Sequence, residues 1–88
     1  MSDSLIDRHK LQAKRIMARI TQPGLAKRAG LSKGTISAIE LGTRSPMPET
    51  LGKLADGLRC DIAELMPDGL DPELVRAIRE TAAAATAA

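Results

Sequence analysis

The sequence contains no phenylalanine, tyrosine or tryptophan. This absence excludes proteins that bind single-stranded nucleic acids by stacking bases on aromatic side chains, and it excludes the aromatic-bearing sheet of an RNA-recognition motif. A core without aromatic rings is built from leucine, isoleucine, valine, methionine and alanine. Such a core favours a helical protein.

Cysteine and histidine are nearly absent as well. The only cysteine, Cys60, cannot form a disulfide within the chain, so we expect a protein of a reducing compartment such as the bacterial cytosol. Cys60 and the only histidine, His9, lie far apart in the sequence and lack the spacing of zinc ligands. Because no catalytic Ser–His–Asp set and no glycine-rich phosphate loop occurs, we predict no enzymatic activity, cofactor, metal or small-molecule ligand.

Long apolar segments are missing too. No apolar run approaches the ~20 residues needed to cross a bilayer, and the first four residues lack the charged and apolar regions of a secretion signal. We therefore expect no membrane association. The length of 88 residues suits one small domain, whose modest core gives partner contacts a share in its stability.

Charge is distributed unevenly, although the net charge is only +2. Residues 49–88 contain eight acidic side chains and four basic ones, whereas residues 8–48 contain a single acid, Glu40. The basic side chains of residues 8–48 number nine: Arg8, Lys10, Lys14, Arg15, Arg19, Lys27, Arg28, Lys33 and Arg44. A cationic N-terminal half indicates a polyanionic partner on one side of the protein, although lopsided charge also occurs on surfaces that face only solvent.

The pattern of apolar and capping residues predicts helices throughout. Apolar residues recur three or four positions apart, and no strand-like alternation occurs. The expected N-caps are Thr21, Ser32, Asp61 and Asp71, and the expected helix ends are Gly30 and Gly42. We predict helices over residues 7–18, 22–29, 33–41, 48–58, 62–66 and 72–82, followed by an alanine-rich tail that can fray.

The segment from Thr21 to Gly42 carries the strongest functional signal. It contains two short predicted helices joined by Ala-Gly-Leu-Ser, and Gly30 supplies the left-handed turn between them. The interior is expected to contain Leu25, Ala26, Leu31, Ile36 and Ile39. The outer face of the second helix carries only small or polar residues: Lys33, Gly34, Ser37 and Ala38. Such a helix fits a major groove about 12 Å wide, so the segment predicts a helix-turn-helix unit.

This segment resembles the Cro/C1-type helix-turn-helix repressors of phages and plasmids, the XRE family. The family pattern is roughly Thr-Gln-x-x-Leu-Ala-x-x-Ala-Gly-Leu-Ser-x-x-x-Ile-Ser-x-Ile-Glu-x-Gly, and the resemblance extends over residues 11–66. In length and single-domain build the chain is similar to small plasmid repressors. The resemblance implies a five-helix Cro/C1-type domain in residues 1–67, to which residues 68–88 add a C-terminal helix and the alanine-rich tail.

The resemblance also implies roles for individual residues. Gln22 matches a glutamine that contacts a phosphate and braces the recognition helix. The positions that match base-reading or backbone-contacting residues of that helix are Lys33, Gly34, Thr35, Ser37 and Ala38. Thr43 and Arg44 match a loop that grips phosphates and can reach the minor groove. Arg15 and Glu40 match a charged pair that ties the first helix to the end of the recognition helix.

Several of these positions have a second interpretation. Lys33 can donate to the O6 and N7 atoms of guanine, or it can contact a phosphate or remain solvated. Ser37 can read a base or can merely be small enough to let the helix enter the groove. For Ala38 the second interpretation is preferred. The remaining cations of the N-terminal half are expected to supply general electrostatic attraction rather than specific contacts.

The sequence departs from the family pattern at three places. Pro23-Gly24 replaces the usual polar and acidic pair, which removes the capping-box glutamate from the second helix. Gly34 has no side chain with which to read a base. Arg59 stands where the family commonly has glycine after the fourth helix, and a left-handed backbone there would strain it by about 1 kcal/mol or more.

Residues 68–88 lie beyond the family core and contain an apolar stripe. The stripe consists of Leu70, Leu74, Val75 and Ile78. Because little else in a small domain is left to cover it, we predict that it forms the interface of a homodimer. The alternative is that this helix packs back on its own domain.

Together these features predict a sequence-specific regulator of transcription, specifically a repressor, that binds an inverted repeat in double-stranded DNA as a homodimer. It would act on the nucleoid in the bacterial cytosol. Two alternatives with the same chemistry are a DNA-binding antitoxin and a controller protein of a restriction–modification system. An alternative of another class is a protein-interaction adaptor that has kept the fold and lost DNA binding.

Overall fold

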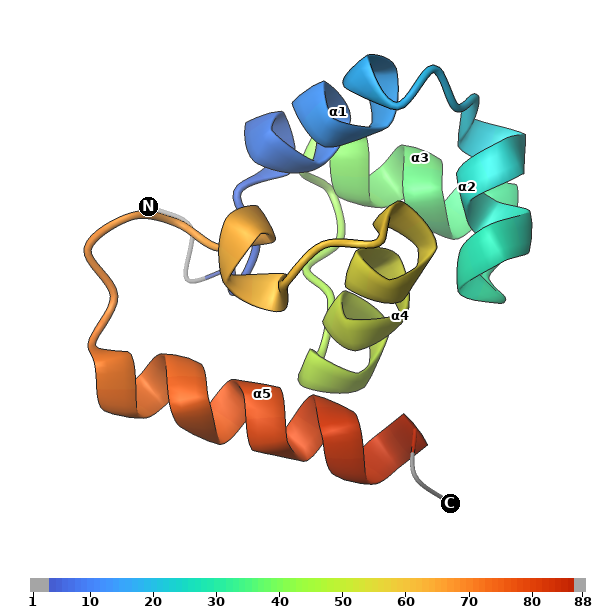
Figure 1. The fold of residues 1–88 in the computed structure, drawn as a ribbon. Coiled ribbons are helices and arrows are strands. Elements are labelled where there is room, and N and C mark those ends of the chain that lie inside the picture. Colours follow the sequence, from blue (N-terminus) through green and yellow to red (C-terminus); the bar gives the residue numbers. More distant parts are fainter. Residues whose placement is uncertain (1–3, 87–88) are drawn as a thin grey trace.

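The computed structural model describes residues 4–86 as five α-helices and one 3₁₀ turn, with no strand in that part of the chain (Figure 1). The elements are α1 (Arg8–Met17), α2 (Gln22–Ala29), α3 (Lys33–Leu41), α4 (Pro48–Leu58), η1 (Ile62–Leu65) and α5 (Pro72–Thr86). Every predicted helix is present, so the prediction of an all-α fold is confirmed. No helix of the described residues is both long and apolar enough to cross a membrane.

Local sequence explains where α2 and α3 begin and end. Thr21 Oγ1 accepts a hydrogen bond of 3.1 Å from a backbone N–H of α2, and Ser32 Oγ accepts one of 3.1 Å from a backbone N–H of α3. These bonds satisfy N–H groups that have no partner within the helix. Gly30 and Gly42 then end the two helices with φ angles of 69° and 81°, which glycine adopts at little cost.

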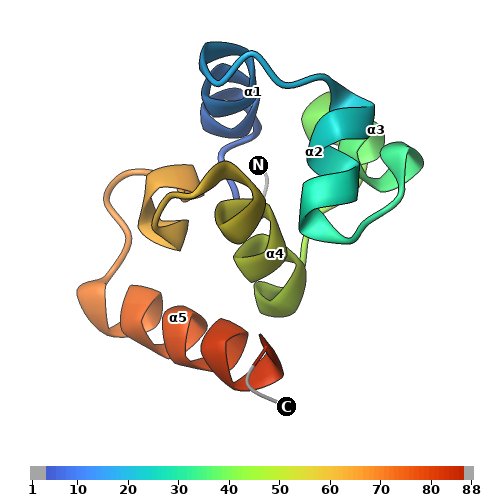
Figure 2. The same ribbon diagram turned by 45° about the vertical axis from the view of Figure 1, so that its right-hand side comes forward.

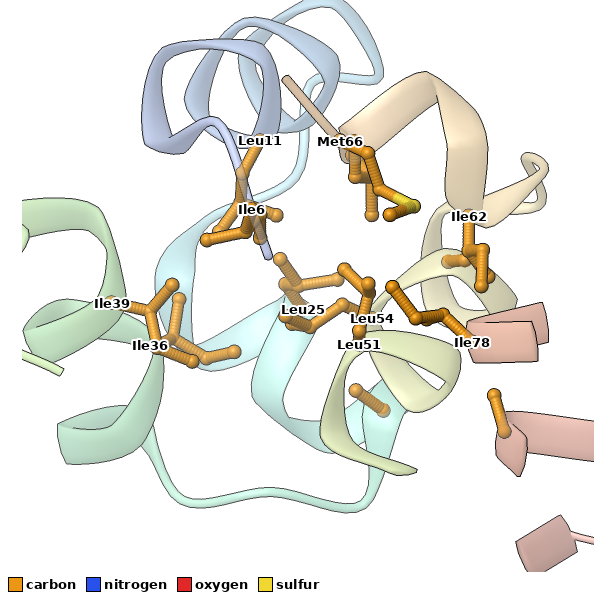
Figure 3. Packing of buried hydrophobic residues seen from close by; sticks show 14 of the residues in the cluster. Ile6, Leu11, Leu25, Ile36, Ile39, Leu51, Leu54, Ile62, Met66 and Ile78 are labelled. Carbon is orange, nitrogen blue, oxygen red and sulfur yellow. The ribbon is translucent and has the colours of Figure 1, made fainter. Parts of the chain in front are cut away.

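A single apolar core joins the helices, and α4 lies at its centre. Both ribbon views show α4 between α2 and α5 (Figures 1 and 2). Leu25 of α2 meets Leu51 and Leu54 of α4 in the middle of the cluster (Figure 3), and all three side chains are fully buried. Ile36 and Ile39 extend the same core beneath α3, as the sequence predicts. The core therefore fixes α3 with one face inward and the opposite face outward.

The apolar residues of α1 do not all face this core. Leu11 is fully buried, but Ile16 and Met17 are 58% and 81% exposed, and Ala13 is exposed as well. The apolar spacing of Ala13 and Met17 therefore does not mark the inner face of the helix. The reason is that α1 packs mainly against α3 and η1, and polar contacts such as that of Arg15 fix its last turn.

The C-terminal helix α5 packs along α4 through small residues. Gly52 of α4 approaches Ala82 so closely that a Cβ atom at position 52 would lie 2.9 Å from the Ala82 Cβ. Arg79 adds an ion pair to Asp61, with 2.7 Å between Nη2 and Oδ2, which lowers the pKa of the Asp61 carboxyl. α5 continues past the predicted end at Ala82 to Thr86, which agrees with the high helix propensity of alanine. The last two residues of the alanine-rich tail lie outside the described residues.

Two arginines adopt a left-handed backbone. Arg59 ends α4 with φ of 55°, so the strain that the sequence suggested at this position is present. Arg19, after α1, has φ of 58°, and nothing in the sequence analysis indicated it. In both cases the Cβ atom lies close to a carbonyl oxygen, a conformation that costs non-glycine residues roughly 1–2 kcal/mol.

We expect Arg59→Gly to raise the free energy of unfolding by about 0.5–1 kcal/mol, because glycine removes the steric cost of the left-handed backbone but loses more entropy on folding. Urea denaturation measures the change. Arg59→Ala is the matched control, since it removes the charge and keeps the Cβ atom. An equal gain in both variants would show that charge, rather than backbone strain, determines the stability at this position.

Candidate nucleic-acid interface

Helices α2 and α3 form the predicted helix-turn-helix unit. The turn between them is closed by a hydrogen bond of 2.8 Å from the Leu31 N–H to the Ala26 carbonyl oxygen. Ala26 is 4% exposed, so its small side chain allows α2 to lie close to its neighbours. Figure 2 shows α2 in front of α3, with the turn connecting them at one end. The unit presents α3 at the surface of the domain.

The outer face of α3 is lined by small residues. Successive helical residues are rotated by ~100°, so the inward positions of Ile36 and Ile39 direct Gly34 and Ala38 away from the core. Lys33 and Gly34 are exposed, and Ser37 and Ala38 are half-buried. The positions predicted to meet bases are therefore brought together on one accessible side of α3, and no long side chain on Gly34 or Ala38 keeps a duplex away.

Leu41 is a surface residue of α3 that the sequence analysis missed. It lies seven positions after Gly34, on the same side of the helix, and is 67% exposed. The spacing Gly34, Ala38, Leu41 is the ordinary helical spacing of one face, so counting from Gly34 would have found it. The exposed face of α3 therefore ends in an apolar side chain.

Glu40 is the centre of a polar network beneath α3. Arg15 binds its carboxylate through two hydrogen bonds, Nε to Oε2 at 2.6 Å and Nη2 to Oε1 at 3.0 Å. The Glu40 side chain is only 3% exposed and that of Arg15 14%. This hydrogen bonding raises the pKa of the Arg15 guanidinium above its usual range. The structure thus shows the predicted pair between α1 and the end of α3, buried and bidentate.

Gln22 connects the same network to α2. Its Nε2 atom donates a hydrogen bond of 3.2 Å to Glu40 Oε1, so the first residue of α2 is fixed against the last turn of α3. The side chain is half-buried, and its amide retains a second N–H and a carbonyl oxygen for other partners. The bracing role that the resemblance implied for Gln22 is therefore seen in its contacts.

The loop after α3 returns along the surface of that helix. The N–H and the hydroxyl of Thr43 both donate to the Ala38 carbonyl oxygen, at 3.0 and 3.1 Å. From this anchored position Arg44 extends back to the first turn of α3, where its Nη1 atom lies 3.3 Å from Thr35 Oγ1. Both loop residues are exposed. The predicted loop contacts and the predicted helix contacts therefore belong to one continuous surface.

Not all the cations of residues 8–48 face this surface. Lys10 and Lys14 pair with Asp68 and Glu64, at 2.7 and 2.8 Å. The hydrogen bond from Lys14 lowers the pKa of the Glu64 carboxyl. Because these two lysines bridge to the acidic half of the chain, the basic surface available to a polyanion is smaller than the sequence count indicates.

Arg8 is a further cation that the sequence analysis did not single out. Its Nη1 atom donates a hydrogen bond of 3.1 Å to the Glu40 carbonyl oxygen. Its side chain also lies against Gly42, where a Cβ atom would come within 3.1 Å of Arg8 Cδ. Arg8 therefore holds the C-terminal end of α3 while remaining exposed beside the Thr43–Arg44 loop.

The four residues of the predicted dimer stripe are buried to different extents. Leu74 is 44% exposed, Leu70 and Val75 are partly buried against the core, and Ile78 is 5% exposed beneath α5. Ile78 thus packs on its own domain. The sequence analysis gave this packing as the alternative to a dimer interface for the whole C-terminal helix. Leu74 is the stripe residue that the monomer leaves most open.

Among residues 4–86 no three His, Cys, Asp or Glu side chains are grouped closely enough to hold a metal ion. Cys60 is half-buried, and its burial raises the pKa of the thiol above its ordinary value. A raised pKa leaves the thiol protonated at neutral pH and weakens it as a nucleophile.

Comparison with known proteins identifies the family. Residues 11–65 match the model of a family described as helix-turn-helix, a region that extends from α1 through η1. No curated protein and no solved structure gave a match. The matched region contains the α2–turn–α3 unit, the Glu40 network and the loop of Arg44. The chain belongs to the XRE-type helix-turn-helix family of DNA-binding transcriptional regulators.

Proposed function

We propose that the protein is a repressor that binds a specific inverted repeat in double-stranded DNA as a homodimer. The observation that supports this most strongly is the outer face of α3, which combines the small residues Gly34 and Ala38 with exposed cations at Lys33 and Arg44. A helix of this kind can approach the floor of the major groove closely. We propose further that the concentration of the protein itself sets the degree of repression.

The proposed contacts divide by their chemistry. Lys33, at the first exposed turn of α3, donates to base edges, most favourably to guanine, and Ser37 reads the next base. Gly34 and Ala38 admit the helix to the groove. Gln22, Thr43 and Arg44 hold the phosphates on either side, with Thr35 near the DNA backbone beside Arg44, which fixes the register of α3 without selecting a sequence.

A dimer is proposed because one helix-turn-helix unit makes few contacts with DNA. Two units related by a twofold axis would place their half-sites about 34 Å apart, or a multiple of that distance. The exposed Leu74 side chain and the outer edges of Leu70 and Val75 supply the proposed contact surface, with Ile78 supporting it from below.

Lys33→Ala and Arg44→Ala should affect DNA binding in different ways. Lys33→Ala is expected to relax the preference at one or two base pairs by about 1–3 kcal/mol, because a base-specific donor is lost. Arg44→Ala is expected to weaken all duplexes about equally. Sequence selection from a random duplex library, followed by affinity measurements on point-substituted duplexes, tests both. If Lys33→Ala weakens every sequence alike, Lys33 is a phosphate contact and the proposed base reading is wrong.

Leu74→Glu should convert the dimer to a monomer while leaving the fold intact, because it places a charge in the proposed apolar contact. Sedimentation equilibrium measures the change, with circular dichroism as the check of folding. Ala83→Glu, at an exposed position about 180° around the same helix from Leu74, is the matched control. Removal of α5 is a poorer test, since it would also uncover the core around Ile78. A wild-type monomer, or a Leu74→Glu variant that still dimerises, would refute the proposed interface.

A further inference from the structure

We infer that Thr35 is a positioning residue. Its hydroxyl holds the Arg44 guanidinium beside the recognition helix, in a position to contact the phosphates of the DNA backbone. The inference rests on the proposed function, since it assigns the means by which Arg44 is presented to a duplex. It starts from the hydrogen bond of 3.3 Å between Arg44 Nη1 and Thr35 Oγ1, which joins residues nine positions apart in the sequence.

The direction of the hydrogen bonds makes Thr35 a suitable support. A guanidinium only donates, so Thr35 Oγ1 is the acceptor of the bond from Arg44. Its own proton is then available to Ser32 Oγ, which lies 2.8 Å away. Ser32 Oγ is fixed in turn because it accepts the Thr35 N–H at the start of α3. Three side chains therefore form one chain of contacts anchored on the helix terminus.

The other end of the Arg44 segment is fixed as well. Thr43 is bound through both its N–H and its hydroxyl to the Ala38 carbonyl oxygen. Arg44 is thus fixed at its base by the anchored residue before it, and at its tip by Thr35. An exposed arginine normally loses much of its conformational freedom when it binds, and an arginine already held in place loses less.

The position of Thr35 on α3 indicates which part of the duplex Arg44 meets. Gly34 is exposed and lies opposite the inward Ile36, and Thr35 is rotated by ~100° from Gly34 toward one flank of the helix. A helix that lies in the major groove turns its outer face toward the bases and its flanks toward the groove walls. The Arg44 guanidinium at this flank therefore faces the phosphates along one side of the major groove. There its positive charge can replace a counterion of the DNA.

The test is a double-variant cycle measured with a labelled duplex selected from a random library. In the otherwise wild-type chain, Thr35→Val, which preserves the shape and removes the hydroxyl, should weaken binding by about threefold to tenfold. In an Arg44→Ala background the same change should have an effect of less than about twofold, because no guanidinium is left to position. Thr35→Ser restores the hydroxyl and should restore most of the affinity.

Controls separate this role from a general loss of structure. Thr81→Val makes the same substitution on α5, where the hydroxyl donates to the Ala77 carbonyl oxygen far from α3, and it should leave affinity unchanged. Equal losses in both backgrounds, no loss in the wild-type background, or failure of Thr35→Ser to restore binding would each overturn the role of Thr35 while leaving DNA binding intact. If the wild-type chain binds no duplex at low salt, the proposed function fails and this inference fails with it.

Discussion

Glu40→Ala is expected to lower the free energy of unfolding by about 3–5 kcal/mol, because it leaves a partly buried guanidinium without its partner. In the structure the Glu40 carboxylate accepts two hydrogen bonds from Arg15 and a third from Gln22. Its removal would break the side-chain links from Arg15 of α1 and from Gln22 of α2 to the end of α3, and only the bond from Arg8 to the backbone carbonyl of residue 40 would remain of this network. A loss of this size is a large part of the 5–15 kcal/mol that stabilises a typical domain.

Urea denaturation monitored by circular dichroism measures this effect. Glu64→Ala is a matched control, because it also removes a carboxylate paired with a cation of α1. At this exposed site it breaks the pair with Lys14 and the hydrogen bond from the Asp61 N–H, and its effect should be clearly smaller than that of Glu40→Ala. Glu40→Gln keeps the side-chain shape and one acceptor oxygen and should cost less than Glu40→Ala. An unchanged melting temperature together with lost sequence discrimination would show that Glu40 reads DNA instead of holding the fold.

The affinity for the selected duplex should fall by about 10³-fold or more between 50 and 200 mM salt if the dimer makes six or more phosphate contacts. The physical cause is the release of counterions from the DNA when basic side chains replace them. Exposed cations on the α3 side of the domain, Arg44 and Arg8 among them, are the proposed source of these contacts, whereas Lys33 is proposed to read bases. Lys10 and Lys14 are expected to contribute little, since carboxylates of their own chain already neutralise them.

Fluorescence anisotropy over a series of salt concentrations gives the slope of log K against log salt. Arg44→Ala should reduce that slope by about one per protomer. Lys53→Ala, which removes a cation of α4 paired with Glu49, should leave it unchanged. A slope near zero, or an equal change from both substitutions, would mean that the surface around α3 is not the one that meets the phosphates.

Local signals in the sequence were sufficient to predict the helix-turn-helix unit. Thr21 and Ser32 cap their helices through side-chain oxygens, and Gly30 and Gly42 adopt the left-handed conformations that end them. These effects depend on a few neighbouring residues, so they can be recognised before any packing is known. The inward positions of Ile36 and Ile39 follow from helical spacing within the same segment.

Features that depend on tertiary packing were not predictable in the same way. Ala13 and Met17 have the spacing of an inner face but remain exposed, because too few elements cover the outer side of α1. Ile78 fits an unpartnered stripe in the sequence, yet α4 of the same chain covers it. The contact between Arg44 and Thr35 joins a loop to a helix terminus, and no spacing rule relates those two positions.

The proposed binding mode places the outer face of α3 in the major groove. NOEs measured between protein and DNA protons, in a complex with the selected duplex, show whether α3 lies there. The Ala38 methyl group is the most informative probe, because it lies on that face and has no rotameric freedom. If α3 lies in the major groove, this methyl group gives NOEs to cytosine H5 or thymine methyl protons, which line that groove. NOEs to DNA that arise from α5 or α1, with none from Ala38, would contradict this binding mode.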